Sequence, residues 1–175
     1  ETAINLVLDR FVTHAVGPGR ERIDVSGPPV YFNPEPFRDY DRWIDFARQN
    51  QIVVSAIVLI RRSRRSAAPD PLQHPESDGG VYAMPDLSTR RGAIVYRHVL
   101  DSIARRYCNT DKSPGGITNW IAHNEVDFHS VWTNIGRQPR EVCTETYYRS
   151  MRMIHNAARS HNPHARVFVS LTHHW

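Results

Sequence analysis

The run Ile52-Val53-Val54-Ser55-Ala56-Ile57-Val58-Leu59-Ile60 decides the fold class of this 175-residue chain. It is nearly all apolar and rich in β-branched side chains. A strand that is covered on both faces, as in a parallel sheet, has this composition. The run therefore predicts a buried strand of a parallel α/β sheet.

The sequence on both sides of this run continues an alternation of strands and helices. Short apolar runs predict further strands, and apolar residues at helical spacing predict helices. The predicted strands are residues 4–8, 52–60, 117–124 and 165–172, and the predicted helices are 37–49, 89–107 and 141–160. Ser88 is expected to cap the second helix. Regular βαβ alternation predicts four parallel strands joined by right-handed helical crossovers.

The loops that follow the predicted strands are long, whereas those that precede them are short. The long loops are residues 9–36, 61–87 and 125–139. Parallel α/β proteins place their active sites in loops at the carboxyl ends of the strands. No glycine-rich phosphate motif follows any strand, which argues against a nucleotide-binding sheet and favours a barrel with a catalytic rim.

Composition excludes some classes of partner. The formal net charge is +4 and the isoelectric point is about 9.4, a value that can indicate nucleic-acid binding. The arginines are scattered, however, except for a cluster within residues 61–65, so we expect a solvated loop and no nucleic-acid partner. No run of about 18 apolar residues predicts a membrane span. Cys108 and Cys143 lack metal-ligand spacing, and the sequence leaves open whether they form a disulfide or stay free thiols.

The strongest chemical signal is Trp120-Ile121-Ala122-His123-Asn124-Glu125. Here a carboxylate ends an apolar strand and opens a long loop, directly after an amide and an imidazole. A carboxyl group at the mouth of a barrel can donate a proton to a leaving group, and Asn124 can hydrogen-bond a sugar hydroxyl. The alternative is that Glu125 only caps the loop or forms a salt bridge in it.

The Asn-Glu pair resembles the acid/base motif of clan A glycoside hydrolases, in which it ends the fourth strand of a (β/α)₈ barrel. Wider segments look closer to a bacterial family that is assigned a glycoside hydrolase-like barrel. These segments are residues 30–34, 119–136, 148–152 and 169–175. The resemblance implies that residues 1–175 form one partial TIM barrel with strands two to five, cut from a longer chain at both ends. It also implies retention of anomeric configuration, no cofactor, and a glutamate nucleophile on a seventh strand beyond Trp175.

Further residues are candidates for binding the carbohydrate. His123 and Asp127 flank the Asn-Glu pair, and Asp127 could instead be an ordinary loop acid. Other candidates lie on segments that follow strands, namely Tyr31, Asn33, Trp132, His173, His174 and Trp175. The aromatic rings suit the apolar faces of sugars, although packing is an equal alternative. Asn33 could instead cap the helix that follows it.

Two other functions stay open. A metal-dependent barrel hydrolase would gather His and Asp at strand ends, but the sequence has no HxH or HExxH spacing, so we expect no metal. A barrel that binds carbohydrate without turnover is the second alternative. The resemblance also implies a secreted or periplasmic protein whose signal segment is not in this chain. We expect residues 1–175 alone to be inactive and prone to associate through unpaired sheet edges.

Overall fold

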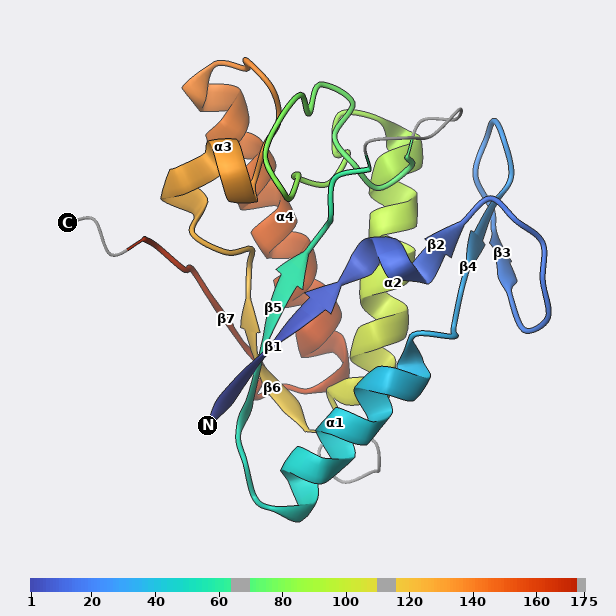
Figure 1. Cartoon of the computed structure of the whole chain (residues 1–175), viewed down its shortest axis with the longest axis vertical. Coiled ribbons are helices and arrows are strands. Elements are labelled where there is room, and N and C mark those ends of the chain that lie inside the picture. The colour runs from blue at the N-terminus through green and yellow to red at the C-terminus, as the bar shows by residue number, and fades with distance from the viewer. Residues whose placement is uncertain (64–69, 110–115, 173–175) are drawn as a thin grey trace.

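The computed structural model of the chain describes residues 1–63, 70–109 and 116–172, and its centre is a four-stranded parallel sheet (Figure 1). The strands are β1 (Thr2–Val7), β5 (Val54–Leu59), β6 (Ile117–Ile121) and β7 (Arg166–Phe168). They lie in the order β1-β5-β6-β7, and each pairs in parallel with its neighbour. The predicted α/β class and the four parallel strands are confirmed.

Three helices connect these strands, close to their predicted limits. They are α1 (Phe37–Gln49), α2 (Arg90–Tyr107) and α4 (Arg140–His161). The predicted cap of α2 is wrong by one residue. The hydroxyl of Thr89, not Ser88, accepts a hydrogen bond from the Gly92 N–H at 3.0 Å. The Ser88 hydroxyl instead donates to the carboxylate of Asp86 at 2.7 Å. Asp86 is buried and also accepts from the Ser88 and Thr89 N–H groups, so it holds the turn before the helix.

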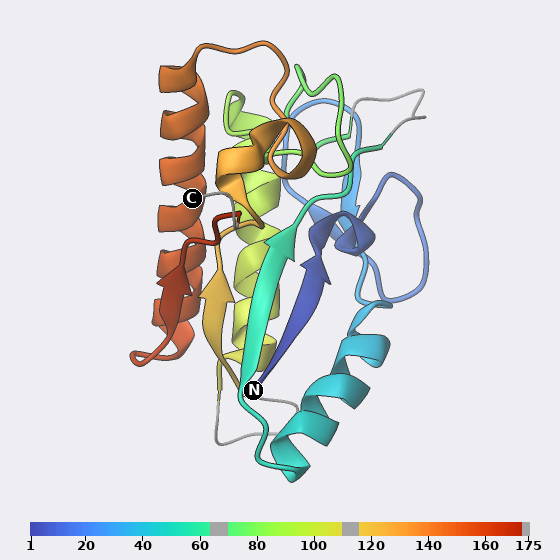
Figure 2. The ribbon, with the colours of Figure 1, turned by 60° about the vertical axis from the view of Figure 1, so that its left-hand side comes forward.

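The three helices pack against one face of the sheet. Side chains of a parallel strand alternate between faces, and residues in register share a face. Ile4, Ala56, Trp120 and Val167 are in register and belong to, or pack against, one core cluster with the helices. The next row is absent from that cluster; it consists of Asn5, Ile57, Ile121 and Phe168. Figure 2 shows this second face of the sheet without a covering helix.

A small antiparallel sheet occupies the region after β1, where the sequence predicted only a loop. A 3-10 turn η1 (Leu8–Phe11) leads into β2 (Val12–Thr13), β3 (Glu21–Ile23) and β4 (Val30–Phe32), in the order β2-β4-β3. The strands have two or three residues each, too few for a period-two pattern to stand out. Phe11 and Phe32 stack at 5.9 Å between ring centroids and join this sheet to the main core.

The loop after β6 contains two short helical turns, η2 (Val126–Phe128) and α3 (His129–Trp132). Cys108 and Cys143 are free thiols, which decides the alternative that the sequence left open. Within the described ranges, no helix has the length and apolar character needed to cross a bilayer.

Candidate functional site

The candidate site begins where β6 ends, in a backbone segment held in an unusual conformation. His123 and Glu125 have φ angles of +65° and +39°, in the left-handed region. Among the described residues, Gln51 is the only other non-glycine residue with positive φ. Each such residue costs about 1–3 kcal/mol, and such residues concentrate at functional sites because the surrounding structure must hold them. The Asn124-Glu125 pair is therefore presented by a strained turn.

A buried hydrogen-bond network holds this turn from below. The His123 ring is 1% exposed, and its Nδ1 lies 3.0 Å from the Val58 carbonyl, so Nδ1 carries the proton. Its Nε2 accepts from the Ser150 hydroxyl at 2.8 Å, and Ser150 in turn accepts from the Tyr96 hydroxyl at 2.8 Å. Burial lowers the pKa of the His123 imidazole to about 4, so the ring is neutral.

His123 thus differs from its predicted role. With both ring nitrogens bonded inside the core, it is a positioning residue rather than a contact for substrate. The sequence could not distinguish these roles, because the partners Val58 and Ser150 lie on other elements, 65 and 27 residues away.

Above this network, the side chains of Asn124 and Glu125 are uncommitted. Both residues are partly exposed, and neither side chain makes a hydrogen bond to a described residue. The backbone is fixed, since the Glu125 and Val126 N–H groups donate to the hydroxyl and carbonyl of Ser170 at 3.4 and 3.1 Å. The turn therefore offers a carboxylate and an amide that bond no other described residue, on a rigid support.

Asp127 ties the site to the segment after β7. Its two carboxylate oxygens accept from the N–H and the hydroxyl of Thr172, at 2.8 and 2.6 Å. These bonds join the β6 loop to the segment that follows β7, and they assign Asp127 a structural role in addition to any contact with a sugar.

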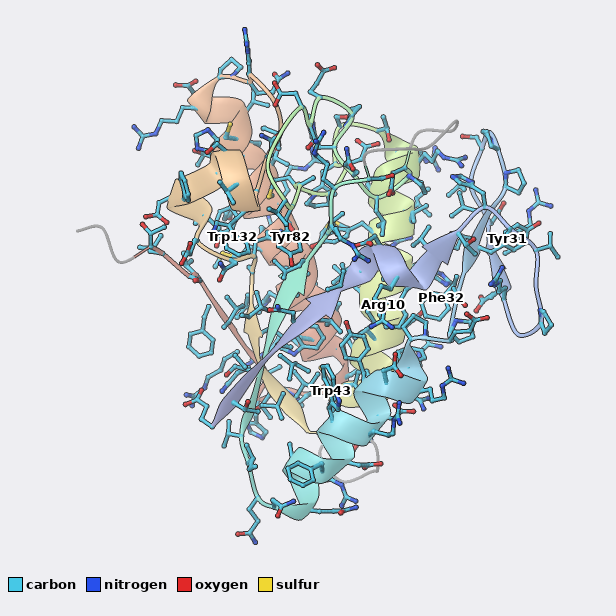
Figure 3. All side chains as sticks on the ribbon, in the orientation of Figure 1. Arg10, Tyr31, Phe32, Trp43, Tyr82 and Trp132 are labelled. Carbon is cyan, nitrogen blue, oxygen red and sulfur yellow. The ribbon has the colours of Figure 1, made fainter. Side chains whose placement is uncertain are left out.

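Trp132 stacks on Tyr82, with ring centroids 5.3 Å apart and planes 9° from parallel. Figure 3 shows the pair near the carboxyl end of β5. Backbone bonds join the two loops that carry the rings, since the Val81 and Tyr82 N–H groups both donate to the Val131 carbonyl at 3.0 Å. Both rings are partly exposed. Sequence analysis missed Tyr82 because it lies 50 residues from Trp132 in a loop without a regular pattern.

Asn134 locks these two loops together. Its side-chain oxygen accepts from Ser77, Asp78 and Gly136 at 3.0–3.2 Å, and its amide donates to the Ser130 carbonyl. Gly136 has φ +73°, and a Cβ there would meet the Glu76 carbonyl at 2.0 Å. The loops that carry Tyr82 and Trp132 are therefore firmly held, as is the turn at Glu125.

Two predicted residues lie elsewhere. Tyr31 is in β4, and Figure 3 places it at the opposite side of the molecule from Trp132 and Tyr82. The Asn33 side chain accepts from the Glu35 N–H and donates to the Arg10 carbonyl, both at 3.3 Å, so it holds the turn before α1. The structure thus does not bring Tyr31 and Asn33 to the candidate site. His173, His174 and Trp175 lie outside the described residues.

A second carboxyl group marks the same edge of the sheet. Asp9, just after β1, accepts from the Arg61 N–H at 2.7 Å and lies 3.6 Å from the Arg61 guanidinium. Burial raises the pKa of the Asp9 carboxyl, and Arg61 offsets part of this rise. Asp9 therefore connects the loops after β1 and β5. Over the described parts of the chain, no group of three or more His, Cys, Asp or Glu side chains is arranged to hold a metal ion.

Comparison with known proteins identifies a family. The sequence fits the model of a family described as a family of unknown function (DUF5722), over residues 1–175. No curated protein and no solved structure matches the chain.

Proposed function

The chain belongs to the DUF5722 family, and we propose that it is the catalytic part of a retaining glycoside hydrolase in which Glu125 is the general acid/base. The observation that carries this proposal is the strained turn after β6, which holds an uncommitted carboxylate beside an uncommitted amide at the carboxyl edge of a parallel sheet. The resemblance of the Asn124-Glu125 pair to the clan A motif adds the reaction type.

We propose a partial (β/α)₈ barrel as the scaffold. In doubly wound sheets the strand order reverses at a switch point, whereas here it follows the chain without reversal and the helices share one face. A barrel has this arrangement. A groove of about 670 Å³ runs along β1 and α1, where Trp43 and Phe46 are 60% and 63% exposed. Figure 3 shows Trp43 on α1. In a closed barrel, a neighbouring strand and helix would cover these side chains.

Each group has a role in the proposed reaction. Glu125 protonates the glycosidic oxygen as the bond breaks, and then removes a proton from the attacking water. Asn124 hydrogen-bonds the 2-hydroxyl of the sugar, an interaction that strengthens in the transition state. The Trp132–Tyr82 pair offers an aromatic face to the sugar ring. The nucleophile is a second carboxylate, which we assign to no residue of this chain.

The test is Glu125→Gln in the full-length protein, assayed on polysaccharides and on nitrophenyl glycosides. Loss of the acid should slow cleavage of sugars with poor leaving groups about a hundredfold or more. Nitrophenyl glycosides should lose less in the first step, because their leaving group needs no proton. Glu145→Gln, an exposed glutamate on α4, is the matched control and should keep full activity.

Other outcomes would decide against this proposal. Equal losses on both kinds of substrate would remove the general-acid role from Glu125. Loss of activity on chelation would indicate a metal-dependent hydrolase. Saccharide binding without turnover by the wild-type protein would identify a carbohydrate-binding barrel instead.

A further inference from the structure

A cavity of about 520 Å³ lies beside the candidate site, between the segment after Glu125 and the first turns of α4. Its wall includes Val126 and Asp127, the two residues that directly follow Glu125. The polar residues that line the remainder are His129, Thr133, Gln138, Arg140, Thr144 and Tyr147. No part of the proposed reaction uses this cavity.

Hydrogen-bond donors in this wall lack acceptors. The Tyr147 hydroxyl is buried and has no hydrogen-bond partner among the described residues. Burial raises the pKa of this hydroxyl to about 12, so it keeps its proton and can donate. The side chains of His129 and Arg140 are exposed and that of Gln138 is partly buried, and they make no hydrogen bond or ion pair to a described residue. A buried donor without an acceptor is costly, so the cavity is suited to a ligand that accepts.

Electrostatics favour a negatively charged acceptor. Arg140 begins α4, a helix of 22 residues whose first turn has no side-chain cap, so its free N–H groups add positive potential. The acids nearby are Asp127 in the cavity wall, whose two oxygens already accept from Thr172, Glu125 directly before that wall, and the exposed Glu141 in the first turn of α4. The positive potential therefore comes from the α4 side of the cavity. A carboxylate in the cavity would meet a guanidinium, a phenol and an imidazole.

We infer that this cavity binds the carboxylate of an acidic sugar, so that the substrate is a uronate-containing saccharide. The inference rests on the proposed function, because it places the charged sugar next to the unit whose bond Glu125 would cleave. Arg140 would pair with the carboxylate, and the Tyr147 hydroxyl would donate to one of its oxygens.

The experiment is calorimetric titration of the full-length protein with tetragalacturonate and with its methyl ester, which has the same sugars without charge. The free acid should bind at least about tenfold more tightly. Arg140→Gln and Tyr147→Phe should each weaken binding of the acid about tenfold and leave binding of the ester unchanged. Arg149→Gln, an exposed arginine on the same helix, should change neither.

A second readout separates binding from folding. Removal of a hydroxyl that has no partner in the described parts of the chain should not lower the melting temperature of Tyr147→Phe, so weaker binding cannot be attributed to unfolding. Sulfated galactotetraose tests whether the cavity prefers a sulfate ester to a carboxylate. If it binds more tightly than tetragalacturonate, the ligand of the cavity is a sulfate ester and the inference is overturned.

The inference and the proposed function can fail separately. Equal binding of acid and ester, no binding of either, or no effect of Arg140→Gln would overturn the inference, whatever Glu125→Gln does to hydrolysis. Conversely, suppose that the acid binds in an Arg140-dependent way but is not cleaved. The inference that the cavity binds an acidic sugar would then hold, and the proposed glycosidase function would be wrong.

Discussion

The loops after β1 and after β6 leave the same edge of the sheet, yet they use their polar residues differently. The loop after β1 folds into the small sheet β2-β4-β3, in which strand pairing holds the backbone of Tyr31 and turn bonds engage the Asn33 side chain. In the loop after β6, the side chains of Asn124 and Glu125 make no hydrogen bond to a described residue, while the backbone is strained at His123 and Glu125.

This difference shows that a position at the carboxyl edge is not enough to make a site. In the first loop, turn bonds engage the Asn33 side chain, so that amide is not available to a ligand. In the second, the core network around His123 and the bonds to Ser170 hold the backbone, and the side chains stay available. Uncommitted polar groups on a rigid support mark a candidate site more reliably than residue type.

The largest effect expected from this comparison is the loss of stability on acidification caused by His123. The folded protein lowers the pKa of this imidazole from 6.5 to about 4, so only the unfolded chain takes up the proton in that range. The contribution of His123 is complete above about pH 6.5 and declines as pH falls towards 4, by about 3 kcal/mol in total. Denaturant unfolding at several pH values measures it.

The matched variant is His123→Gln, which cannot take up a proton. It should be less stable at pH 7, but its stability should change less than that of the wild type between pH 6.5 and 4. Parallel pH profiles for the two proteins would show that His123 does not hold the turn as a neutral, buried ring.

The next effect concerns the aromatic candidates of the two loops. Trp132→Ala removes one ring of the stacked pair, and we expect about a tenfold loss of affinity for the saccharide, equivalent to about 1.4 kcal/mol. Tyr31→Ala should change this affinity less than about twofold, because β4 lies away from the stacked pair (Figure 3). Calorimetry on both variants compares the loops directly, and a larger loss from Tyr31→Ala would reverse our assignment of the site.

Much of the fold was predictable because it depends on local periodicity. The predicted helix 37–49 matches α1. The predicted strand 52–60 contains β5, and side chains on both faces of β5 are largely buried. The small sheet was missed because its strands are too short for periodicity and its pairing joins residues up to 20 positions apart, as in Val12 with Phe32.

The candidate site was predictable only in part, for a similar reason. Sequence order identified Asn124 and Glu125, since they directly follow an apolar strand. It could not identify Tyr82 beneath Trp132, or Tyr147 in the cavity, because these contacts join separate elements. An amphipathic pattern places Tyr147 on the buried side of α4, but only the three-dimensional arrangement shows that no other described residue bonds its hydroxyl.

The smallest expected effect comes from comparing the two asparagines. Asn33→Ala removes two side-chain hydrogen bonds at the turn before α1, each 3.3 Å long and partly exposed, so unfolding should become easier by about 1 kcal/mol with saccharide binding unchanged. Asn124→Ala removes a side chain that makes no hydrogen bond to a described residue, so stability should stay within about 0.5 kcal/mol while hydrolysis slows. Thermal unfolding and activity of both variants test this pairing. If Asn124→Ala were the more destabilising change, the amide would serve the fold, and the β6 loop would resemble the β1 loop after all.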